Sequence, residues 1–478
     1  MRTVLKRKRR LINLVAAAVF LCGLAGAASA QDKTEPQTGQ QTGKPQSPET
    51  APARSPISPL PAFAVIGPSR ELKFAENTWF RFGAQVQGWF RIAQDRNATA
   101  SDPQGTYAMD YYCRRCRFFA TGSVVKDVYF NILFEAANFG RFDATQVATP
   151  PNISTKTLGI PQILDAYGQV RFADWFWLSG GSILLPLTRN GLQPTTTYLS
   201  IDTSNVAATP AAQGNTFVLR DTGFQANGFV AGNHVEYRVG VYQGTRQGAT
   251  ATQSGSHNGP RVVTMLSANF WDTETGYVNG GHYFGTKRVL GVMGNFDYQI
   301  LRKDGPAAFP LNTAFTGAEK NAYYGASGAI FLNLPLTGAN PRGGDELVGL
   351  LQFGYYDGGF RGPALPPLAA ATTITNAGTY PLILKQTNYL AEAAYYNHAG
   401  RFSIFGKYEM RKISDDFNAA AKTANNLTWI AGGLKYYVAP SNFMNFGLQY
   451  ERIMNNDAPD NQQSGTNNVT FQMQVILY

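Results

Sequence analysis

Residues 79–92 read WFRFGAQVQGWFRI, and apolar and polar side chains alternate along most of this segment. One face carries Phe82 and Val86, whereas the opposite face carries Arg81 and Gln85. Successive side chains of a strand point to opposite faces, so this period of two predicts a β-strand with one apolar and one polar face. The segment exceeds the usual length of a soluble strand and is long enough to cross a bilayer at a tilt.

The same alternation recurs at 126–137, 163–175 and 401–412. Two all-β architectures fit such strands: a soluble sandwich with an apolar core, or an outer-membrane barrel whose apolar face meets lipid and whose polar face lines a wet interior. The length of the strands favours the barrel. We therefore expect an all-β chain that folds into a transmembrane antiparallel β-barrel.

Long and short connections between the predicted strands alternate, as membrane barrels of this kind require. The long segments lie at 93–108, 138–162, 187–216, 245–260, 302–319, 359–385, 413–426 and 454–466, and the short ones near 122–126, 174, 231–233, 272–287, 333–345, 398–400 and 438–441. Eight long and seven short connections join sixteen strands and place both ends of the barrel on the periplasmic side. We interpret 272–287 as an extended turn, because one more strand would separate the two ends.

The first 30 residues predict a secretory signal peptide. Residues 1–10 hold six basic side chains, an apolar run follows to about Ala27, and Ala28-Ser29-Ala30 is a small-residue cleavage site. An uncleaved membrane anchor is the alternative. Most of the formal net charge of +10 belongs to this segment, so nucleic-acid binding is not expected. Residues 31–62 are rich in Pro and Gln and predict a flexible linker, which leaves 63–478 for the barrel.

Three cysteines are too few for a disulfide scaffold. Cys113 and Cys116 lie three residues apart, and on a regular strand such residues point to opposite faces about 10 Å from each other. A disulfide tolerates at most about 7 Å between Cα atoms, so we expect unpaired thiols unless the segment turns. Two cysteines without a second pair of ligands predict no metal site.

Catalytic patterns and cofactor motifs are not evident. The four histidines are scattered without a nucleophile motif, and the Gly-containing turn at 279–281 lacks the continuation of a phosphate-binding loop. We therefore expect no enzyme activity and no cofactor. The last strand, 468–478, is amphipathic and ends on Tyr478, which is similar to the signal that the barrel-assembly machinery reads.

Five short segments carry a family resemblance: 111–118 (YYCRRCRF), 165–167 (DAY), 219–223 (LRDTG), 239–244 (VGVYQG) and 283–287 (YFGTK). In this order they resemble the phosphate-selective porin O and P family. The resemblance implies a sixteen-stranded porin in the outer membrane of a Gram-negative bacterium, usually a homotrimer, with a third loop folded inward. That loop would be 187–216 and would include Arg189 and Asn190. Phosphate-selective members carry a dense lysine ladder, and this chain has none.

The candidate pore-lining and anion-selecting residues are basic side chains in phase with the polar faces, together with one residue of the third loop. They are Arg115, Arg117, Arg171, Arg189, Arg238, Lys407, Arg411 and Lys435. Acidic side chains face the same way, so an ion pair in the barrel wall is the alternative role for each; these acids are Glu135, Asp165, Glu236 and Glu409. Arg114, Arg115 and Arg117 are the strongest candidates, because no acidic residue lies beside them in the sequence.

These observations predict an outer-membrane porin that passes small hydrophilic solutes and ions, with a mild preference for anions such as phosphate. Its expected partners are outer-membrane lipid, small anions or other hydrophilic solutes, the barrel-assembly machinery and two further copies of the chain. The alternative is a closed or plugged barrel that serves as a structural or adhesive surface protein. The apolar loop 359–385 motivates that alternative.

Overall fold

The computed structural model describes residues 71–94, 107–141, 161–210, 219–244, 259–300, 322–358, 383–415, 422, 425–457 and 465–477. The predicted signal peptide (1–30), the predicted linker (31–62) and nearly all of loop 359–385 lie outside the described residues.

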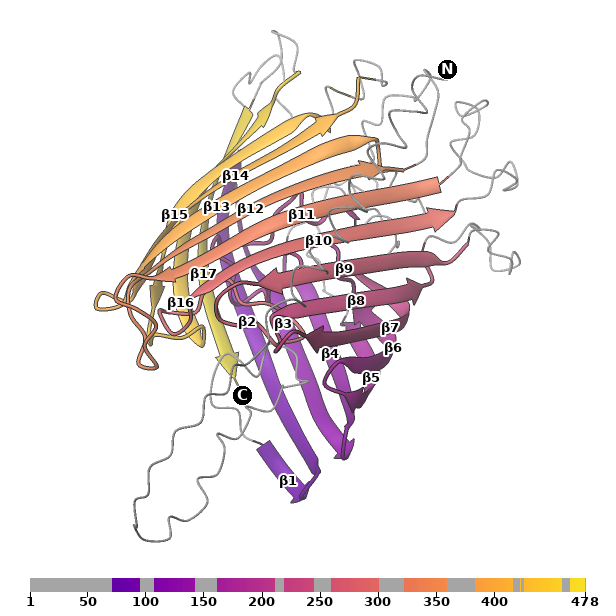
Figure 1. Ribbon diagram of the computed structural model, residues 1–478. Coiled ribbons are helices and arrows are strands. Elements are labelled where there is room, and N and C mark those ends of the chain that lie inside the picture. The colour runs from indigo at the N-terminus through magenta and orange to yellow at the C-terminus, as the bar shows by residue number, and fades with distance from the viewer. Residues whose placement is uncertain are drawn as a thin grey trace, which may run out of the picture. The chain divides into compact units, whose positions relative to one another are not determined.

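Seventeen strands lie within this part of the chain (Figure 1). They are β1 (Glu71–Ala75), β2 (Thr78–Gln94), β3 (Tyr107–Val125), β4 (Val128–Phe139), β5 (Gln162–Ala173), β6 (Phe176–Leu184), β7 (Arg220–Val230), β8 (Val235–Tyr242), β9 (Arg261–Asn269), β10 (Val289–Ile300), β11 (Ala322–Pro335), β12 (Glu346–Asp357), β13 (Gln386–Asn397), β14 (Phe402–Ile413), β15 (Leu427–Tyr437), β16 (Met444–Asn455) and β17 (Gly465–Leu477).

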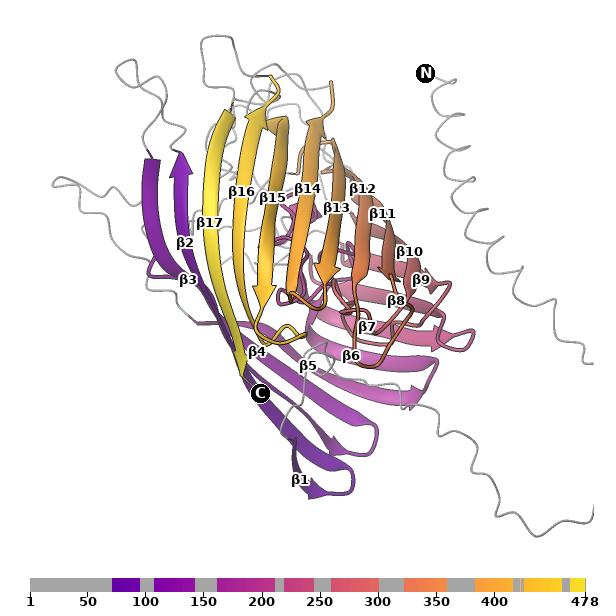
Figure 2. The same ribbon diagram turned by 90° about the vertical axis from the view of Figure 1, so that its left-hand side faces the viewer.

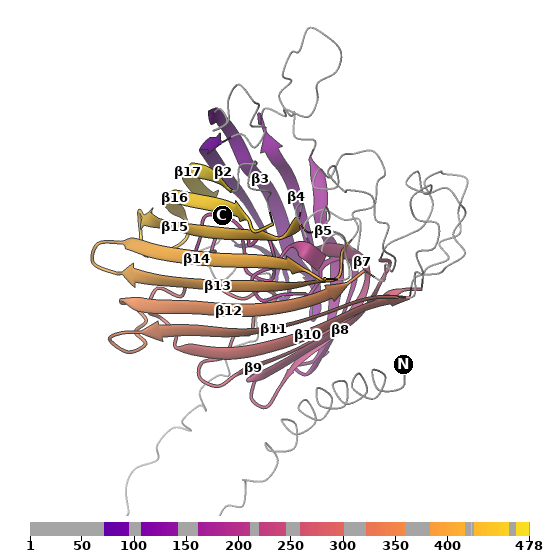
Figure 3. The same cartoon turned by 90° about the horizontal axis from the view of Figure 1, so that it is seen from above.

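Sixteen of the described strands close into an antiparallel barrel. Each strand from β2 to β16 pairs with its successor, and β17 pairs with β2 from Asn468↔Ala93 to Leu477↔Ala84. Figure 2 shows β17 beside β2, and Figure 3 shows β9 to β14 lying side by side. The short strand β1 pairs with residues 78–81 of β2, just beyond the end of β17. The predicted sixteen-stranded barrel is confirmed, with β1 as an addition to it.

Long and short connections alternate around most of the ring, as the sequence predicts, but residues 270–288 between β9 and β10 form a connection about as long as those on either side. Lys126-Asp127 between β3 and β4 is a two-residue turn, and Asp127 has a φ of 63° in the left-handed region that Asp tolerates better than most residues. Residues 270–288 between β9 and β10 contain no strand, so the interpretation of 272–287 as an extended turn is confirmed. Consequently β2 begins and β17 ends at the same end of the barrel.

The outer face of the barrel is apolar. On β3, Phe118 points outward and is 63% exposed, whereas its neighbour Arg117 points inward and is 3% exposed. Outward-facing Phe224 and Ile404 are more than half exposed in the same way. A soluble sandwich would bury this face, so the exposed apolar surface is suited to lipid. Among the described residues, no helix is both long enough and apolar enough to span a membrane.

The inner face is not uniformly polar, which corrects the expectation of a wet interior throughout. Phe331 on β11, Leu350 on β12 and Phe405 on β14 point inward and are buried. Leu199 and Ile201, which lie between β6 and β7, cover them in one apolar cluster. Burial of these side chains beneath a loop removes apolar area from water, so the hydrophobic effect holds the loop on this wall.

Candidate functional site

The third loop, residues 185–219 between β6 and β7, folds into the barrel. It is described as far as Pro210, and all residues from 185 to 201 are buried. The backbone N–H of Asn190 donates to Gln352 Oε1 at 3.1 Å, and Asn190 Nδ2 donates to Glu392 Oε2 at 3.1 Å. On the other side of the loop, Gln85 Nε2 donates to Thr195 Oγ1 at 3.2 Å. The expected inward-folded third loop is therefore present in the described residues.

A buried ion pair anchors the beginning of the third loop to the inward turn, which we define as residues 270–288. Arg189 Nη1 lies 2.6 Å from Glu274 Oε2, and Arg189 Nη2 lies 2.8 Å from Glu274 Oε1. The guanidinium also lies over the ring of Phe331, 4.0 Å from its centroid. Burial lowers the pKa of Arg189, but the Glu274 carboxylate outweighs this effect and holds it above its ordinary value.

The third loop and the inward turn also touch through their backbones. The N–H of Gly281 donates to Thr197 Oγ1 at 3.1 Å. A Cβ at position 281 would lie only 2.1 Å from the carbonyl oxygen of Thr197. Glycine is therefore required at this contact, because any side chain would push the two segments apart.

The tip of the third loop binds two arginines of β3 through one carboxylate. Asp202 Oδ2 accepts from Arg114 Nε at 3.1 Å, and Asp202 Oδ1 lies 2.5 Å from Arg115 Nη2. The side chains of Asp202 and Arg114 are each 22% exposed, so water reaches this contact. Burial raises the pKa of Asp202, but the two guanidinium groups outweigh it and hold the pKa well below its usual range.

A second carboxylate completes this cluster of charges. Glu135 on β4 faces Arg117 directly in the strand register, and Arg117 Nε donates to Glu135 Oε1 at 2.8 Å. Arg115 Nε lies 3.8 Å from the same oxygen. No acid lies beside the three arginines in the sequence, yet the ion pair with Glu135 that was their alternative role forms here, and Asp202 of the third loop adds a second carboxylate. Three guanidinium groups against two carboxylates leave one positive charge in the cluster.

A β-bulge in β3 directs the arginines inward. Arg115 pairs with Gln87 and Cys113 pairs with Gly88, so Arg114 is an extra residue without a partner on β2. Arg114 and Arg115 therefore both reach Asp202, although consecutive residues of a regular strand point to opposite faces. We name this feature the Arg114 bulge.

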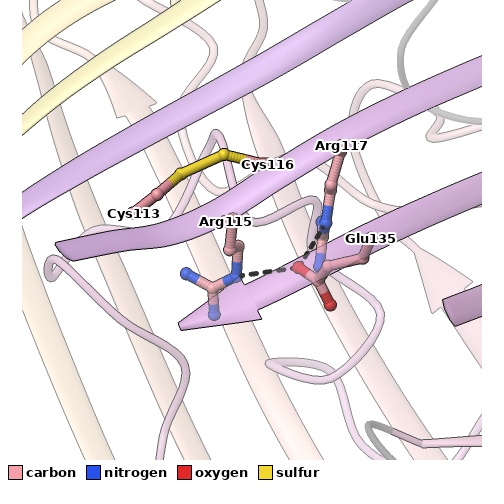
Figure 4. Close-up of a disulfide and its surroundings, with 5 residues drawn as sticks. All are labelled: Cys113, Arg115, Cys116, Arg117 and Glu135. Carbon is pink, nitrogen blue, oxygen red and sulfur yellow. Dashed lines mark hydrogen bonds and ion pairs between the residues drawn. A yellow bond between two sulfur atoms is a disulfide. The ribbon is translucent and has the colours of Figure 1, made fainter. Parts of the chain in front are cut away.

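The Arg114 bulge also overturns the expectation of unpaired thiols. Cys113 and Cys116 form a disulfide, with their Cα atoms 6.4 Å apart. The prediction assumed regular strand spacing, whereas the extra residue shortens the strand and brings both cysteines to its outer side. Figure 4 shows the disulfide on one side of β3, with Arg115, Arg117 and Glu135 on the other side.

Lys407 and Lys435 hold the third loop on the opposite wall. Lys407 Nζ lies 2.7 Å from Glu409 Oε1, and Glu409 Oε2 accepts from the hydroxyl of Ser204 at 2.9 Å. Lys435 Nζ donates to the carbonyl oxygens of Tyr198 and Ser200 at 2.5 and 2.7 Å. Both lysines thus bind to the loop or to its acidic partner.

The other three predicted residues do not join this group. Arg171 pairs with Asp174 at the β5–β6 turn, and Arg238 on β8 pairs with Glu236 of the same strand at 2.7 Å. Arg411 donates to the carbonyl oxygen of Asn425 at 2.8 Å. The third loop therefore brings together Arg115, Arg117, Arg189, Lys407 and Lys435 of the predicted set. For every member of that set, a role in ion selection stays a prediction.

Sequence reasoning missed Asp202 and Glu274. One signal was present for Asp202, because it is the only acidic residue between 185 and 219. A single carboxylate in a loop expected to fold among arginines has few other partners. Glu274 gave no comparable signal, since its partner Arg189 is 85 residues away. No group of three or more His, Cys, Asp or Glu suited to a metal ion occurs in the part of the chain that the structure describes.

No family model matches the chain. No curated protein matches it either. Among solved structures it is similar to Salmonella typhi OmpF in complex with daunomycin, with a TM-score of 0.49 and 10% identity over 85% of this chain and 100% of that chain. It is also similar to the outer-membrane expressed OmpT of Vibrio cholerae, with a TM-score of 0.43 and 9% identity over 85% of this chain and 100% of that chain. A low-pH structure of Pseudomonas putida OprB gives a TM-score of 0.43 and 9% identity over 83% of this chain and 92% of that chain. These likenesses are weak, so the fold rests on the strand pairing of the chain itself, and membership of the porin O and P family stays a prediction.

Proposed function

We propose that this chain is an outer-membrane porin that passes small hydrophilic solutes and ions passively, with a mild preference for anions. The observation that carries the proposal is the closed sixteen-stranded ring within the described residues, apolar outside and charged around an inward-folded loop. A barrel of this size leaves an aqueous interior unless it is plugged. A porin performs no covalent chemistry, and its selectivity comes from charges beside the narrowest part of the path.

The anion preference follows from the charges around Asp202. Arg114, Arg115 and Arg117 outnumber Asp202 and Glu135 by one positive charge. The partial exposure of Arg114 and Asp202 brings this charge into contact with water. One net charge attracts anions weakly, which suits a path that must release what it binds. Phosphate is the oxyanion to test, since the planar fork of arginine can hold two of its oxygens.

The proposal includes a location and partners. The predicted signal peptide would export the chain, the amphipathic strand β17 would be read by the barrel-assembly machinery, and the apolar outer face would lie in outer-membrane lipid of a Gram-negative bacterium. A homotrimer is the expected assembly. Chemical cross-linking of the protein in native membranes tests it, and a single band at the monomer mass would reject it.

Planar-bilayer recordings of the purified protein test the pore directly. We expect discrete open-channel steps and, in a salt gradient, a reversal potential displaced modestly toward that of the anion. Added phosphate should reduce the chloride current if both ions share the path. Clear cation selectivity would contradict the anion preference, and the absence of any step would contradict the pore.

A plugged barrel is the second candidate. The third loop contacts β2, β3, β13, β14 and β15, and the inward turn meets it through the Arg189–Glu274 pair. If the third loop and the inward turn together block the interior, the chain would serve as a structural or adhesive surface protein. Liposome swelling in small sugars separates the two candidates: swelling supports the porin, and its absence together with silent bilayers supports the plug.

A further inference from the structure

We propose that the Cys113–Cys116 disulfide is a positioning element for the third loop, because it holds the Arg114 bulge that directs two guanidinium groups onto Asp202. Residues three apart on a regular strand lie about 10 Å from each other, and a disulfide cannot span that distance. The observed Cα separation is 6.4 Å, so the disulfide can form only where the bulge shortens the strand.

The register of β3 shows what the bulge controls. Arg115 pairs with Gln87 and Cys113 with Gly88, with Arg114 between them. Without the extra residue, one side of β3 would shift by one position along β2. A shift of one residue exchanges the two faces of a strand, so the inward arginines on that side would turn toward the outer face. The S–S bond opposes this shift, because a regular strand would pull the two sulfur atoms apart.

The partners of the arginines then link the disulfide to the loop. Arg114 and Arg115 both bind Asp202, and Arg115 Nη1 also donates to Gln87 Oε1 at 2.6 Å. Two residues after Asp202, the hydroxyl of Ser204 donates to Glu409 on the opposite wall. The tip of the loop is therefore held between β3 and β14. If the bulge loosened, the loop tip would lose its contacts with β3 and keep its contact with β14.

The location of the disulfide agrees with this role. Cys113 and Cys116 lie on the outer side of β3, away from the charged cluster (Figure 4). They make no contact with a permeating ion, so they act only through the backbone that they fix. This positioning role rests on the proposed porin function only where ion permeability is measured.

The main experiment is a double-mutant cycle between the disulfide and Asp202. The variants are Cys113→Ser with Cys116→Ser, Asp202→Asn, and the combination. Amide hydrogen exchange of residues 199–206 in detergent micelles reports the mobility of the loop tip and requires no channel activity. We expect the cysteine variant to speed this exchange by about two- to fivefold, the range that the loss of a partly exposed ion pair spans. In the Asp202→Asn background the same cysteine changes should add nothing, because the contact through which they act is already gone.

Two controls make the result specific. Val86→Ser with Ala136→Ser places hydroxyls beside Cys116 on the outer face and should leave the exchange at 199–206 unchanged. If the cysteine variant fails to fold, the folded wild-type barrel is reduced instead with tris(2-carboxyethyl)phosphine. The phosphine cleaves the S–S bond and becomes its oxide, taking the oxygen from water. Each sulfur gains a hydrogen, and the two thiols are then alkylated.

The outcomes separate this proposal from the pore itself. Faster exchange that disappears in the Asp202→Asn background supports the positioning role, whether or not the protein conducts. Unchanged exchange after loss of the disulfide, or equal effects in both backgrounds, overturns it and makes the disulfide a local staple of β3. If the protein conducts ions, the anion-to-cation permeability ratio is measured in the same variants. The cysteine changes should alter this ratio in wild type but not in the Asp202→Asn background.

Discussion

Arg115 and Asp202 lie 87 residues apart in the sequence, yet Arg115 Nη2 is 2.5 Å from Asp202 Oδ1 inside the barrel. Arg115 belongs to a wall strand, and Asp202 belongs to the tip of the third loop. This contact joins the rigid part of the barrel to the segment that fills it. Further contacts hold the loop to the walls on both sides of the barrel.

Removal of the loop carboxylate should increase the anion preference. In Asp202→Asn the cluster keeps three guanidinium groups and retains only Glu135, so its net charge rises by one. We expect a reversal potential in a salt gradient that moves further toward the anion. Glu451→Gln is the matched control, since Glu451 also faces inward but is bound by Asn468 rather than by the loop. An equal shift in both variants would mean that any interior carboxylate acts alike.

Loss of two arginines should have the opposite effect. With Arg115→Ala and Arg117→Ala, only Arg114 remains against two carboxylates, so the anion preference should disappear or reverse. Glu135 is 4% exposed and would lose its closest partners, which destabilises the barrel by several kcal/mol. Glu135→Gln added to the pair restores neutrality and keeps the measurement interpretable. Lys422→Ala, which removes a cation from an ion pair with exposed Asp415, should leave the reversal potential unchanged.

The Arg189–Glu274 pair should stabilise the fold of the interior. In Glu274→Gln the buried guanidinium loses its charged partner, and we expect a cost of about 3 kcal/mol. Thermal unfolding followed by circular dichroism measures the loss as a lower midpoint. Arg189→Met combined with Glu274→Gln should recover part of it, because no unpaired charge then remains buried. A double variant as unstable as the sum of the two single variants would contradict this account.

The backbone contact at Gly281 should tolerate no side chain. Gly281→Ala places a methyl group against the Thr197 carbonyl and should cost about 1–3 kcal/mol while displacing the third loop. Gly294→Ala is the control, because a Cβ there meets nothing within 4 Å. We expect altered single-channel conductance and a lower unfolding midpoint only in the first variant. Equal conductance and equal unfolding midpoints in the two variants would show that the inward turn can move to accommodate the methyl group.

The Asp202 contact should resist mild acid. The two arginines depress the pKa of Asp202, so the stabilisation that it provides is fully present above the ordinary aspartate pKa and is lost only as the pH falls through the lower, folded value. The contribution of the Asp202 contact to ion selectivity, taken as the difference between wild type and Asp202→Asn, should therefore stay constant from about pH 7 to about pH 4. Bilayer recordings across this range measure it. A transition in wild type near the ordinary aspartate pKa, absent in Asp202→Asn, would contradict the depressed pKa.

The strands could be predicted from the sequence because the alternation of side chains depends only on neighbouring residues. Alternation along 79–92 and 401–412 places apolar side chains on one face by strand geometry alone, and closure of the ring confirms the count of sixteen from the connections. The inward acids Glu135, Glu236 and Glu409 were also in phase with their basic partners. Each of them pairs with a residue on its own strand or on the adjacent one.

Contacts between distant segments were decided only when the chain closed on itself. Asp202 meets Arg114 and Arg115 because the third loop folds back across the barrel, and no local pattern encodes that path. The Arg114 bulge changes the period of β3 at a single residue, which was enough to turn a predicted pair of separate thiols into a disulfide. Periodicity assigns each side chain to a face, whereas the partner that it meets there depends on how loops from elsewhere pack against that face.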